Sequence, residues 1–269
     1  MKTNKTGKIF IVLIASVLGI IFAVGDIPIF IKAESNIPKE AVRTKKEEQL
    51  LSAKTEKIIH SEPDMSDSHM IKEFPVLNQM PELPTGCEIT AMTMVLNYYG
   101  YSADKVQMAT EYLPTLSSAD VYLGDDGILY GNDMNQYFIG DPTTQDGIIC
   151  GTNAIISATN TFLNANGGGL HAVDKTGTDA DRLYRLVKED IPVVVWCTIG
   201  MEDRQNTQGW YTENGQYIDW SKNDHGAVLI GYTKETVTIA DPISGIVDYD
   251  KDQFEKVFSS RGKQCVILE

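Results

Sequence analysis

The chain contains few cysteines and few basic residues. Its 269 residues include 4 Cys, too few for a small scaffold held together by disulfides. Lys and Arg number 23 against 37 Asp and Glu, a net charge of −14, so the basic surplus typical of nucleic-acid binding proteins is absent. With 42% hydrophobic and 22% charged residues, the composition excludes a disordered tail and a multi-span membrane protein, and it suits one ordinary hydrophobic core.

Long apolar runs are also scarce, and the one that stands out lies at the N-terminus. Lys2, Lys5 and Lys8 precede a 17-residue apolar stretch, Ile9–Gly25. A basic start followed by an apolar stretch is typical of a secretory signal or a signal anchor, and 17 residues lies at the lower limit for a spanning helix. We expect residues 1–33 to be a signal peptide or signal anchor, with cleavage left open.

The charges divide the rest of the chain into two parts. Residues 34–72 hold 7 basic and 8 acidic side chains among sparse apolar ones, as expected of a charged stalk or linker. Residues 73–269 hold 12 basic and 28 acidic side chains, a net charge of −16, and form the predicted globular domain. By the positive-inside rule the N-terminal lysines stay in the cytoplasm, so this domain is expected outside the cell membrane. It is either anchored on the extracellular face of the cell membrane or secreted. Membrane contact is expected through the N-terminal segment only.

Helical signals dominate the first half of the predicted domain. Thr85 and Glu88 have the spacing of a capping box, Gly100 can end a helix, and apolar residues between them recur at helical spacing. This pattern predicts a helix over residues 86–99. Further helices are predicted over residues 104–112, from Thr152 towards the glycines at 167–169, and over 178–190. Residues 113–149 are rich in Gly, Asp and Pro, which predicts an irregular loop.

Strand signals dominate the second half. Strands are predicted over residues 193–197, 226–232, 236–240 and 265–268, with a short helix at 252–258. Because helices gather in the N-terminal half and strands in the C-terminal half, the pattern predicts an α+β fold with an antiparallel sheet.

Cys87 is the first candidate for chemistry. It lies in the first turn of the predicted helix, where free backbone N–H groups and the helix dipole favour an anion. Such a position lowers the pKa of a thiol and makes it a nucleophile. A free cysteine is, however, more often a buried packing residue.

His225 and Asp241 form the second candidate pair. A simple register about a turn centred on Thr233 places them opposite each other on two predicted strands. Opposite residues have Cβ atoms about 4.5–5.5 Å apart, so the carboxylate can orient the imidazole and stabilise its charged form. A bulge in either strand would break this register.

Gln79 precedes Cys87 by eight residues. Its amide can supply a hydrogen-bond donor to an oxyanion, together with the backbone N–H of Cys87. A glutamine alone carries little weight.

Together these segments resemble a known family. The run from Leu77 to Glu88, with Asn97–Gly100, is similar to the stand-alone bacterial cysteine peptidases of family thirty-nine-like type. These are relatives of the bacteriocin leader-processing peptidases within the papain superfamily. The segments at 196–201 and 225–232 and the pair Asp241-Pro242 follow in the same order. The resemblance covers about residues 74–268.

The resemblance implies a papain-like cysteine peptidase fold with an N-terminal helical half and a C-terminal antiparallel β-sheet half. It implies Cys87 as nucleophile, His225 as general base and acid, Asp241 as the residue that orients it, and Gln79 in the oxyanion hole. The expected partner is a peptide or protein substrate. No transporter spans or nucleotide-binding motif follow, so cleavage of double-glycine leaders is not implied.

Two other functions stay open. The same four residues can serve a peptidoglycan amidase or an acyl transferase on this fold. A non-catalytic surface module that binds peptides is the alternative outside enzymes, and an ordinary Cys87 thiol pKa favours it. The sequence sets neither the substrate nor the oligomeric state.

No cofactor and no metal are expected. A metal site built from Cys87, His225 and Asp241 lacks a fourth ligand at zinc-like spacing. Cys197 and Cys265 lie in predicted strands as small core residues, and Cys150 is ambiguous. A disulfide between Cys197 and Cys265 is permitted outside the cell.

Overall fold

A computed structural model describes residues 68–269. The predicted N-terminal segment, residues 1–33, and most of the predicted stalk lie outside the described residues. Within residues 68–269, none of the helices is long and apolar enough to cross a bilayer.

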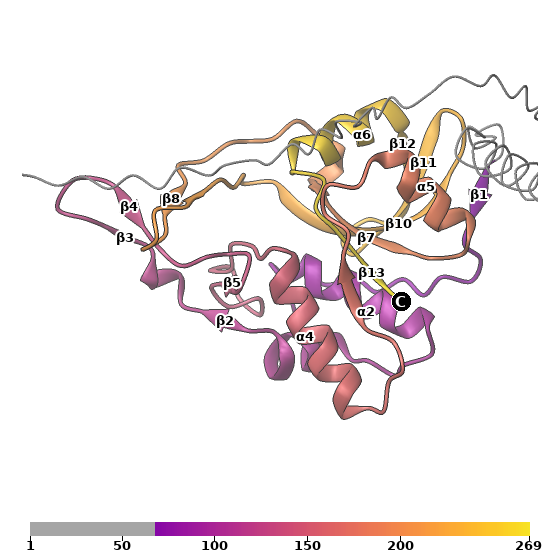
Figure 1. The fold of residues 1–269 in the computed structure, drawn as a ribbon, viewed down its shortest axis with the longest axis horizontal. Helices are drawn as coiled ribbons and strands as arrows, with labels where there is room; N and C mark the ends of the chain where they lie inside the picture. Colours follow the sequence, from indigo (N-terminus) through magenta and orange to yellow (C-terminus); the bar gives the residue numbers. More distant parts are fainter. Residues whose placement is uncertain (1–67) are drawn as a thin grey trace, which may run out of the picture. The chain divides into compact units, whose positions relative to one another are not determined.

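The predicted helices are present. Their bounds are α2 (Cys87–Tyr98), α3 (Lys105–Gln107), α4 (Thr152–Ala165), α5 (Ala180–Lys188) and α6 (Lys251–Ser260) (Figure 1). The helix predicted over residues 104–112 begins as α3, where the Asp104 side chain accepts a hydrogen bond from the backbone N–H of Gln107. It continues as a π-helical turn, Met108–Tyr112.

A seven-stranded antiparallel sheet forms the centre of the domain. Its strands are β1 (His69–Met70), β6 (Ala172–Asp174), β7 (Val193–Thr198), β10 (Asp224–Tyr232), β11 (Thr236–Asp241), β12 (Gly245–Asp250) and β13 (Cys265–Leu268). The order is β12-β11-β10-β7-β13-β6, with β1 paired to β10. The predicted α+β class with an antiparallel sheet is therefore confirmed. Because β1 belongs to the sheet, the folded domain includes residues that the sequence analysis assigned to the stalk.

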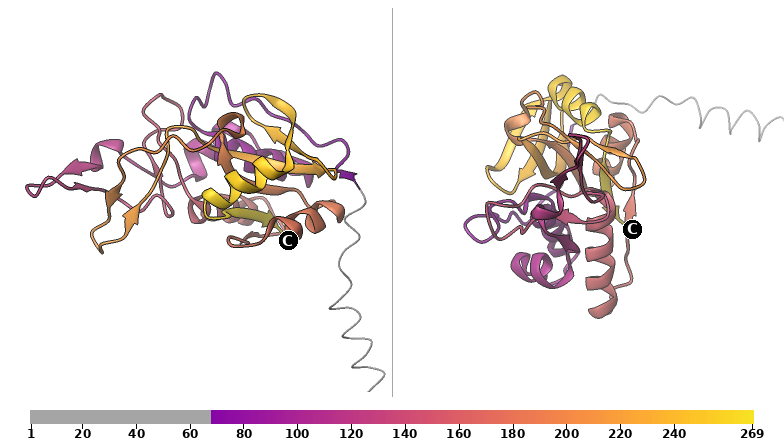
Figure 2. Two further views of the ribbon diagram at one scale, coloured as in Figure 1. Left: turned by 90° about the horizontal axis from the view of Figure 1, so that it is seen from above. Right: turned by 90° about the vertical axis from the view of Figure 1, so that its left-hand side faces the viewer.

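The segment predicted as irregular contains several two-residue strands. They are β2 (Thr115–Leu116), β3 (Tyr122–Leu123), β4 (Leu129–Tyr130) and β5 (Phe138–Ile139). β2 pairs with β5, while β3 and β4 join β8 (Trp210–Tyr211) and β9 (Tyr217–Ile218) in a small sheet. Figure 1 shows this small sheet projecting from the left of the domain, and Figure 2 shows the same projection from above. Two of its pairings are local hairpins, β3–β4 and β8–β9, but the pairing of β4 with β8 joins Tyr130 to Tyr211, and no local pattern predicts it.

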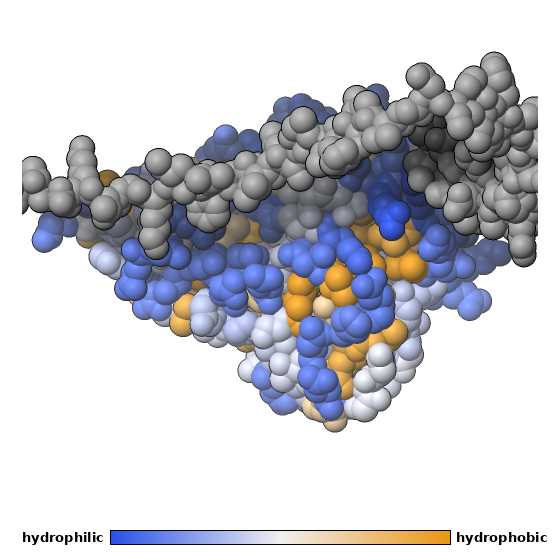
Figure 3. All heavy atoms as spheres, in the orientation of Figure 1, coloured by the Kyte–Doolittle hydropathy of each residue, from blue (hydrophilic) through white to orange (hydrophobic). Residues whose placement is uncertain are grey.

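Helices pack on both faces of the central sheet. Figure 1 shows α2 and α4 below it and α6 above it. α5 lies on the side of α6, since the Tyr184 hydroxyl of α5 donates to Glu255 of α6 at 2.9 Å. With both faces covered, all six residues of β7 are buried. Figure 3 shows hydrophilic residues over most of the visible face of the described part, with apolar residues in smaller areas, in keeping with the acidic composition.

Gly226 of β10 lets α2 approach the sheet closely. A Cβ atom built on Gly226 would lie 2.7 Å from Cα and 2.8 Å from Cγ of Glu88. Contacts that short do not occur between real side chains, so a larger residue here must push the start of α2 away from β10.

We therefore expect Gly226→Ala to destabilise the domain by about 1–3 kcal/mol through overpacking. Gly169→Ala is the matched control, because this exposed glycine has open space around its Cβ position, and its effect should stay within about 0.5 kcal/mol. Urea denaturation followed by circular dichroism measures both. Equal stabilities for the two variants would contradict the close contact.

Candidate active site

Cys87 is the first residue of α2, but the predicted capping box is wrong. The residue that caps the helix is Gly86, which has no side-chain hydrogen bond to give. The Thr85 hydroxyl instead donates to the backbone carbonyl of Thr144 at 3.0 Å. The Glu88 side chain turns into the protein, with 1% of the residue exposed, so neither partner of the box is available.

The Cys87 thiol is buried between α2 and β10. Its Sγ accepts a hydrogen bond from the backbone N–H of Gly226 at 3.3 Å, and the thiol donates to Oε2 of Glu88 at 3.3 Å. Burial raises the pKa of Cys87 well above its ordinary value, and the Glu88 carboxylate adds to this, whereas the Gly226 N–H opposes it. The position of Cys87 at a helix start predicted a lowered pKa for its thiol. In the structure burial outweighs that effect, so the resting group is a thiol.

His225 and Asp241 are in contact, although the predicted register is wrong. His225 Nε2 lies 3.0 Å from Asp241 Oδ2. The pairs Val228↔Ala240 and Tyr232↔Val237 belong to different registers, because β10 carries an irregularity between them. If the register of the pair Val228↔Ala240 continues along β11, Asp241 lies opposite Ala227. His225 lies two residues from Ala227, on the same face, so the contact survives as a diagonal one.

The polar partners of this pair define how the imidazole is held. Asp241 Oδ1 accepts the backbone N–H groups of Ile243 at 2.7 Å and Ser244 at 3.0 Å. Burial by itself would raise the pKa of Asp241, but the hydrogen bond and charge of His225 and these two N–H groups outweigh it and lower the pKa. An ionised Asp241 favours the tautomer with hydrogen on Nε2. His225 Nδ1 is buried without a hydrogen-bond partner, and in that tautomer it is free to accept a proton.

Gln79 is buried beside the turn that leads into Cys87. Its Nε2 donates to the backbone carbonyls of Leu83 at 3.0 Å and Pro84 at 3.1 Å, and its backbone N–H donates to Pro242 O at 2.8 Å. The side chain therefore supports the turn before Cys87, while the backbone joins this turn to the residue after Asp241. Both amide hydrogens are already donated, so an oxyanion would have to replace one of the carbonyls.

The structure thus brings the segments of all four predicted residues to one place. The thiol of Cys87 meets the backbone next to His225, His225 meets Asp241, and Gln79 is tied to Pro242. Sequence reasoning missed Glu88 as part of this place. Its position directly after Cys87 was visible, but the capping-box spacing pointed to the surface instead.

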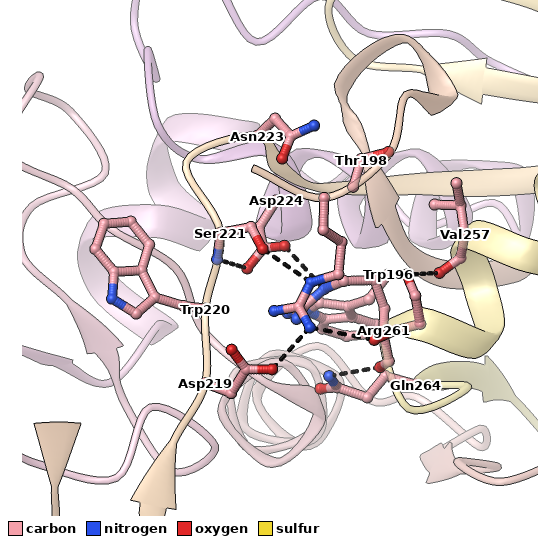
Figure 4. Close-up of polar contacts among 12 residues, drawn as sticks. Trp196, Thr198, Asp219, Trp220, Ser221, Asn223, Asp224, Val257, Arg261 and Gln264 are labelled. Carbon is pink, nitrogen blue, oxygen red and sulfur yellow. Dashed lines mark hydrogen bonds and ion pairs between the residues drawn. The ribbon is translucent and has the colours of Figure 1, made fainter. Parts of the chain in front are cut away.

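A buried ion pair, also missed by sequence reasoning, lies behind His225. Arg261 Nε is 2.9 Å from Oδ1 of Asp224, the residue before His225, and the two side chains are 3% and 2% exposed. The other carboxylate oxygen of Asp224 accepts the backbone N–H of Ser221 at 2.8 Å. Figure 4 shows Arg261 and Asp224 facing each other near the start of β10. This pair anchors the strand that carries His225.

A cavity of about 510 Å³ lies beside the turn that precedes Cys87. Its wall includes Gly140, Asp141, Pro142 and Asp146, which lie in the segment predicted as an irregular loop. Thr85 N–H donates to Pro142 O at 3.4 Å, so this wall is bonded to the segment that carries the thiol. The carboxylates and the threonine and serine hydroxyls around it suit a polar or basic group.

The remaining cysteines are buried free thiols. Cys197 and Cys265 lie on neighbouring strands, but Cys265 pairs with Val195, and the permitted disulfide is not formed. Within residues 68–269, no group of three His, Cys, Asp or Glu side chains is arranged to hold a metal ion.

The fold defines the class of protein: a papain-like cysteine peptidase fold, with a thiol at a helix start against an antiparallel sheet. The chain belongs to the Peptidase_C39 like family, whose model matches residues 71–266. It is similar to the crystal structure of a candidate C39-like peptidase from Bacillus anthracis, with 29% identity and a TM-score of 0.65, over 76% of this chain and 98% of that one. It is also 29% identical over 219 residues to the uncharacterized protein YvpB of Bacillus subtilis (strain 168), covering 80% of this chain and 82% of that protein.

Removing Arg261 should destabilise the domain strongly. Arg261→Gln leaves Asp224 buried without its cation, which typically costs about 3–5 kcal/mol. Lys256→Gln is the matched control, because its ion pair with Asp203 has both side chains more than half exposed and contributes about 0–1 kcal/mol. Chemical denaturation measures both, and similar losses for the two variants would contradict the role given to the buried pair.

Proposed function

We propose that the protein is a cysteine peptidase that hydrolyses peptide bonds through Cys87, His225 and Asp241. The observation that carries the proposal is the arrangement of one thiol and one oriented imidazole. Cys87 Sγ contacts the backbone beside His225, and His225 keeps Nδ1 unpartnered while Nε2 faces Asp241. A thiol, a base and a group that orients the base are the parts that nucleophilic catalysis requires. Membership of the Peptidase_C39 like family supports the same reaction class.

The reaction starts from the thiol, because burial disfavours a resting thiolate. His225 Nδ1 accepts the thiol proton as the sulfur bonds to the peptide carbonyl carbon, and the same nitrogen then protonates the leaving amine. Ionised Asp241 stabilises the imidazolium between these two transfers. Water, deprotonated by His225, releases the acyl group from the thioester.

The oxyanion is proposed to bind the backbone N–H of Cys87 and the amide of Gln79. The first is a free N–H of the first helical turn. The second must leave Leu83 O or Pro84 O when the substrate binds. The adjacent cavity, with Asp141 and Asp146 in its wall, is proposed to take a side chain of the substrate.

The test is hydrolysis by the purified domain. Cys87→Ala should lower peptide hydrolysis by at least about 1,000-fold, because a methyl group cannot form the thioester. Cys265→Ser is the control: its thiol is also buried, but it donates to Lys175 O on the edge of the sheet, so activity should persist. Turnover retained in Cys87→Ala would overturn the proposal.

One observation favours a non-catalytic peptide-binding module, namely the raised pKa of Cys87. Binding without turnover in the wild-type protein is the outcome that selects it.

The other alternative is cleavage of wall peptides or acyl transfer onto them. To distinguish it from peptide hydrolysis, the wild-type protein is incubated with purified peptidoglycan and, in parallel, with a peptide library, and Cys87→Ala serves as the blank. Products from peptidoglycan alone would select an amidase or acyl transferase.

We also propose that the domain works outside the cell membrane, anchored or released. The basic start and the apolar stretch of residues 1–33 support this. Protease added to intact cells should digest the domain, or the domain should appear in the medium. A domain that is protected until the cells are lysed would contradict the proposal.

A further inference from the structure

Glu88 is a buried carboxyl group in contact with the proposed nucleophile. It is 1% exposed, and its Oε2 accepts the Cys87 thiol hydrogen at an Sγ–Oε2 distance of 3.3 Å. Carboxylates are almost never fully buried without partners. The mechanism above does not use this group, although it touches the reacting sulfur.

The close packing of α2 on β10 keeps Glu88 in this position. Gly226 leaves space for Cα and Cγ of Glu88, which lie where a Cβ atom would otherwise be. The same glycine donates its N–H to the sulfur. The Glu88 side chain therefore lies against the backbone of β10 and beside the thiol.

Charged and titratable groups surround this carboxyl group on each packed element. Cys87 lies on its own helix, Cys150 precedes α4, Cys197 lies on β7, His225 on β10, and Arg261 follows α6. Burial is the largest influence and raises the pKa of Glu88 to about 7. Hydrogen bonds from the Glu88 backbone and the Cys87 thiol oppose this rise in pKa, and so do the charge of His225 and a hydrogen bond from the Cys150 backbone. Arg261 is committed to Asp224.

We propose that Glu88 is a further residue of the catalytic centre, which shares a proton with Cys87 and, when ionised, holds the nucleophile as a thiol. The proposal rests on the proposed function. In the exchange the S–H bond breaks, its electron pair stays on sulfur, and the proton bonds to Oε2. The pair carries one negative charge before and after. Because the thiolate is the form that oxidants and alkylating reagents attack, ionised Glu88 protects Cys87 in the free enzyme.

The linked titration has a definite signature. Below about pH 7 both groups are mostly protonated, so the small fraction of Cys87 present as thiolate rises tenfold with each pH unit. Above about pH 7 the pair already carries the negative charge of ionised Glu88. Ionising Cys87 as well would place a second negative charge beside the first, so the thiolate fraction levels off. A variant without the carboxyl group lacks this plateau.

The experiment is the rate of Cys87 alkylation by iodoacetamide, followed by peptide mass mapping, from about pH 5 to pH 9. In the wild type the rate should rise to about pH 7 and then level off. In Glu88→Gln it should match the wild type at low pH and keep rising, so that at pH 9 the variant reacts about 100-fold faster, tenfold for each of two pH units. Glu82→Gln, an exposed carboxyl group paired with Lys105, should behave as the wild type.

Superimposed profiles for the wild type and Glu88→Gln would overturn the inference. Alkylation needs no peptidase activity, so the two failures can be told apart. A protein that cleaves nothing yet shows the two profiles would refute the proposed function, and with it the catalytic role of Glu88, while the proton shared by Cys87 and Glu88 would stand. If Glu88→Gln fails to fold, infrared spectra of the wild type decide. The S–H stretch that is lost in Cys87→Ala should shift as Glu88 ionises near pH 7, and a band that does not move would refute the inference.

Discussion

The close contact between the start of α2 and strand β10 is the constraint on which the site depends. It exists because residue 226 has no side chain, so the backbone of Glu88 comes within the space that a Cβ atom would fill. The contact delivers the Gly226 N–H to the Cys87 sulfur, so the thiol meets the backbone of the residue that follows His225. The Arg261–Asp224 ion pair holds the same end of β10. The strand is therefore fixed at both residues next to His225, Asp224 before it and Gly226 after it.

That packing explains why the electrostatics of the site differ from those of an exposed helix start. A helix N-terminus favours a thiolate where water reaches it, but Cys87 is 7% exposed and has a carboxyl group as its neighbour. Both effects keep the proton on sulfur. The proposed catalysis then requires a base, and the buried Nδ1 of His225, which has no hydrogen-bond partner, is the acceptor that we propose for this role, oriented by Asp241.

The sequence predicted much of this fold, because periodicity and turn residues reflect local physics. The helices α2, α4, α5 and α6 and the strands β7, β10, β11 and β13 appear close to their predicted bounds. The register of the β10–β11 hairpin was wrong by three residues at the turn, where Tyr232 pairs with Val237, and by two residues beyond the irregularity between Leu229 and Gly231, where Val228 pairs with Ala240. No local pattern announces either shift. The His225–Asp241 contact was still right, because a shift of two residues keeps both side chains on one face. Burial of Glu88 and the partner of Asp224 depend on tertiary packing, which no spacing rule shows.

The most direct test of the central claim is to trap the acyl-enzyme. The purified protein is mixed with a library of peptide esters, quenched in acid and mapped by mass spectrometry. Nucleophilic attack by Cys87 predicts an acyl group carried on this residue, which accumulates in the wild type and is absent from a variant with His225 replaced by alanine. Ester cleavage that leaves Cys87 unmodified at every quench time, or acylation at another residue, would contradict the account.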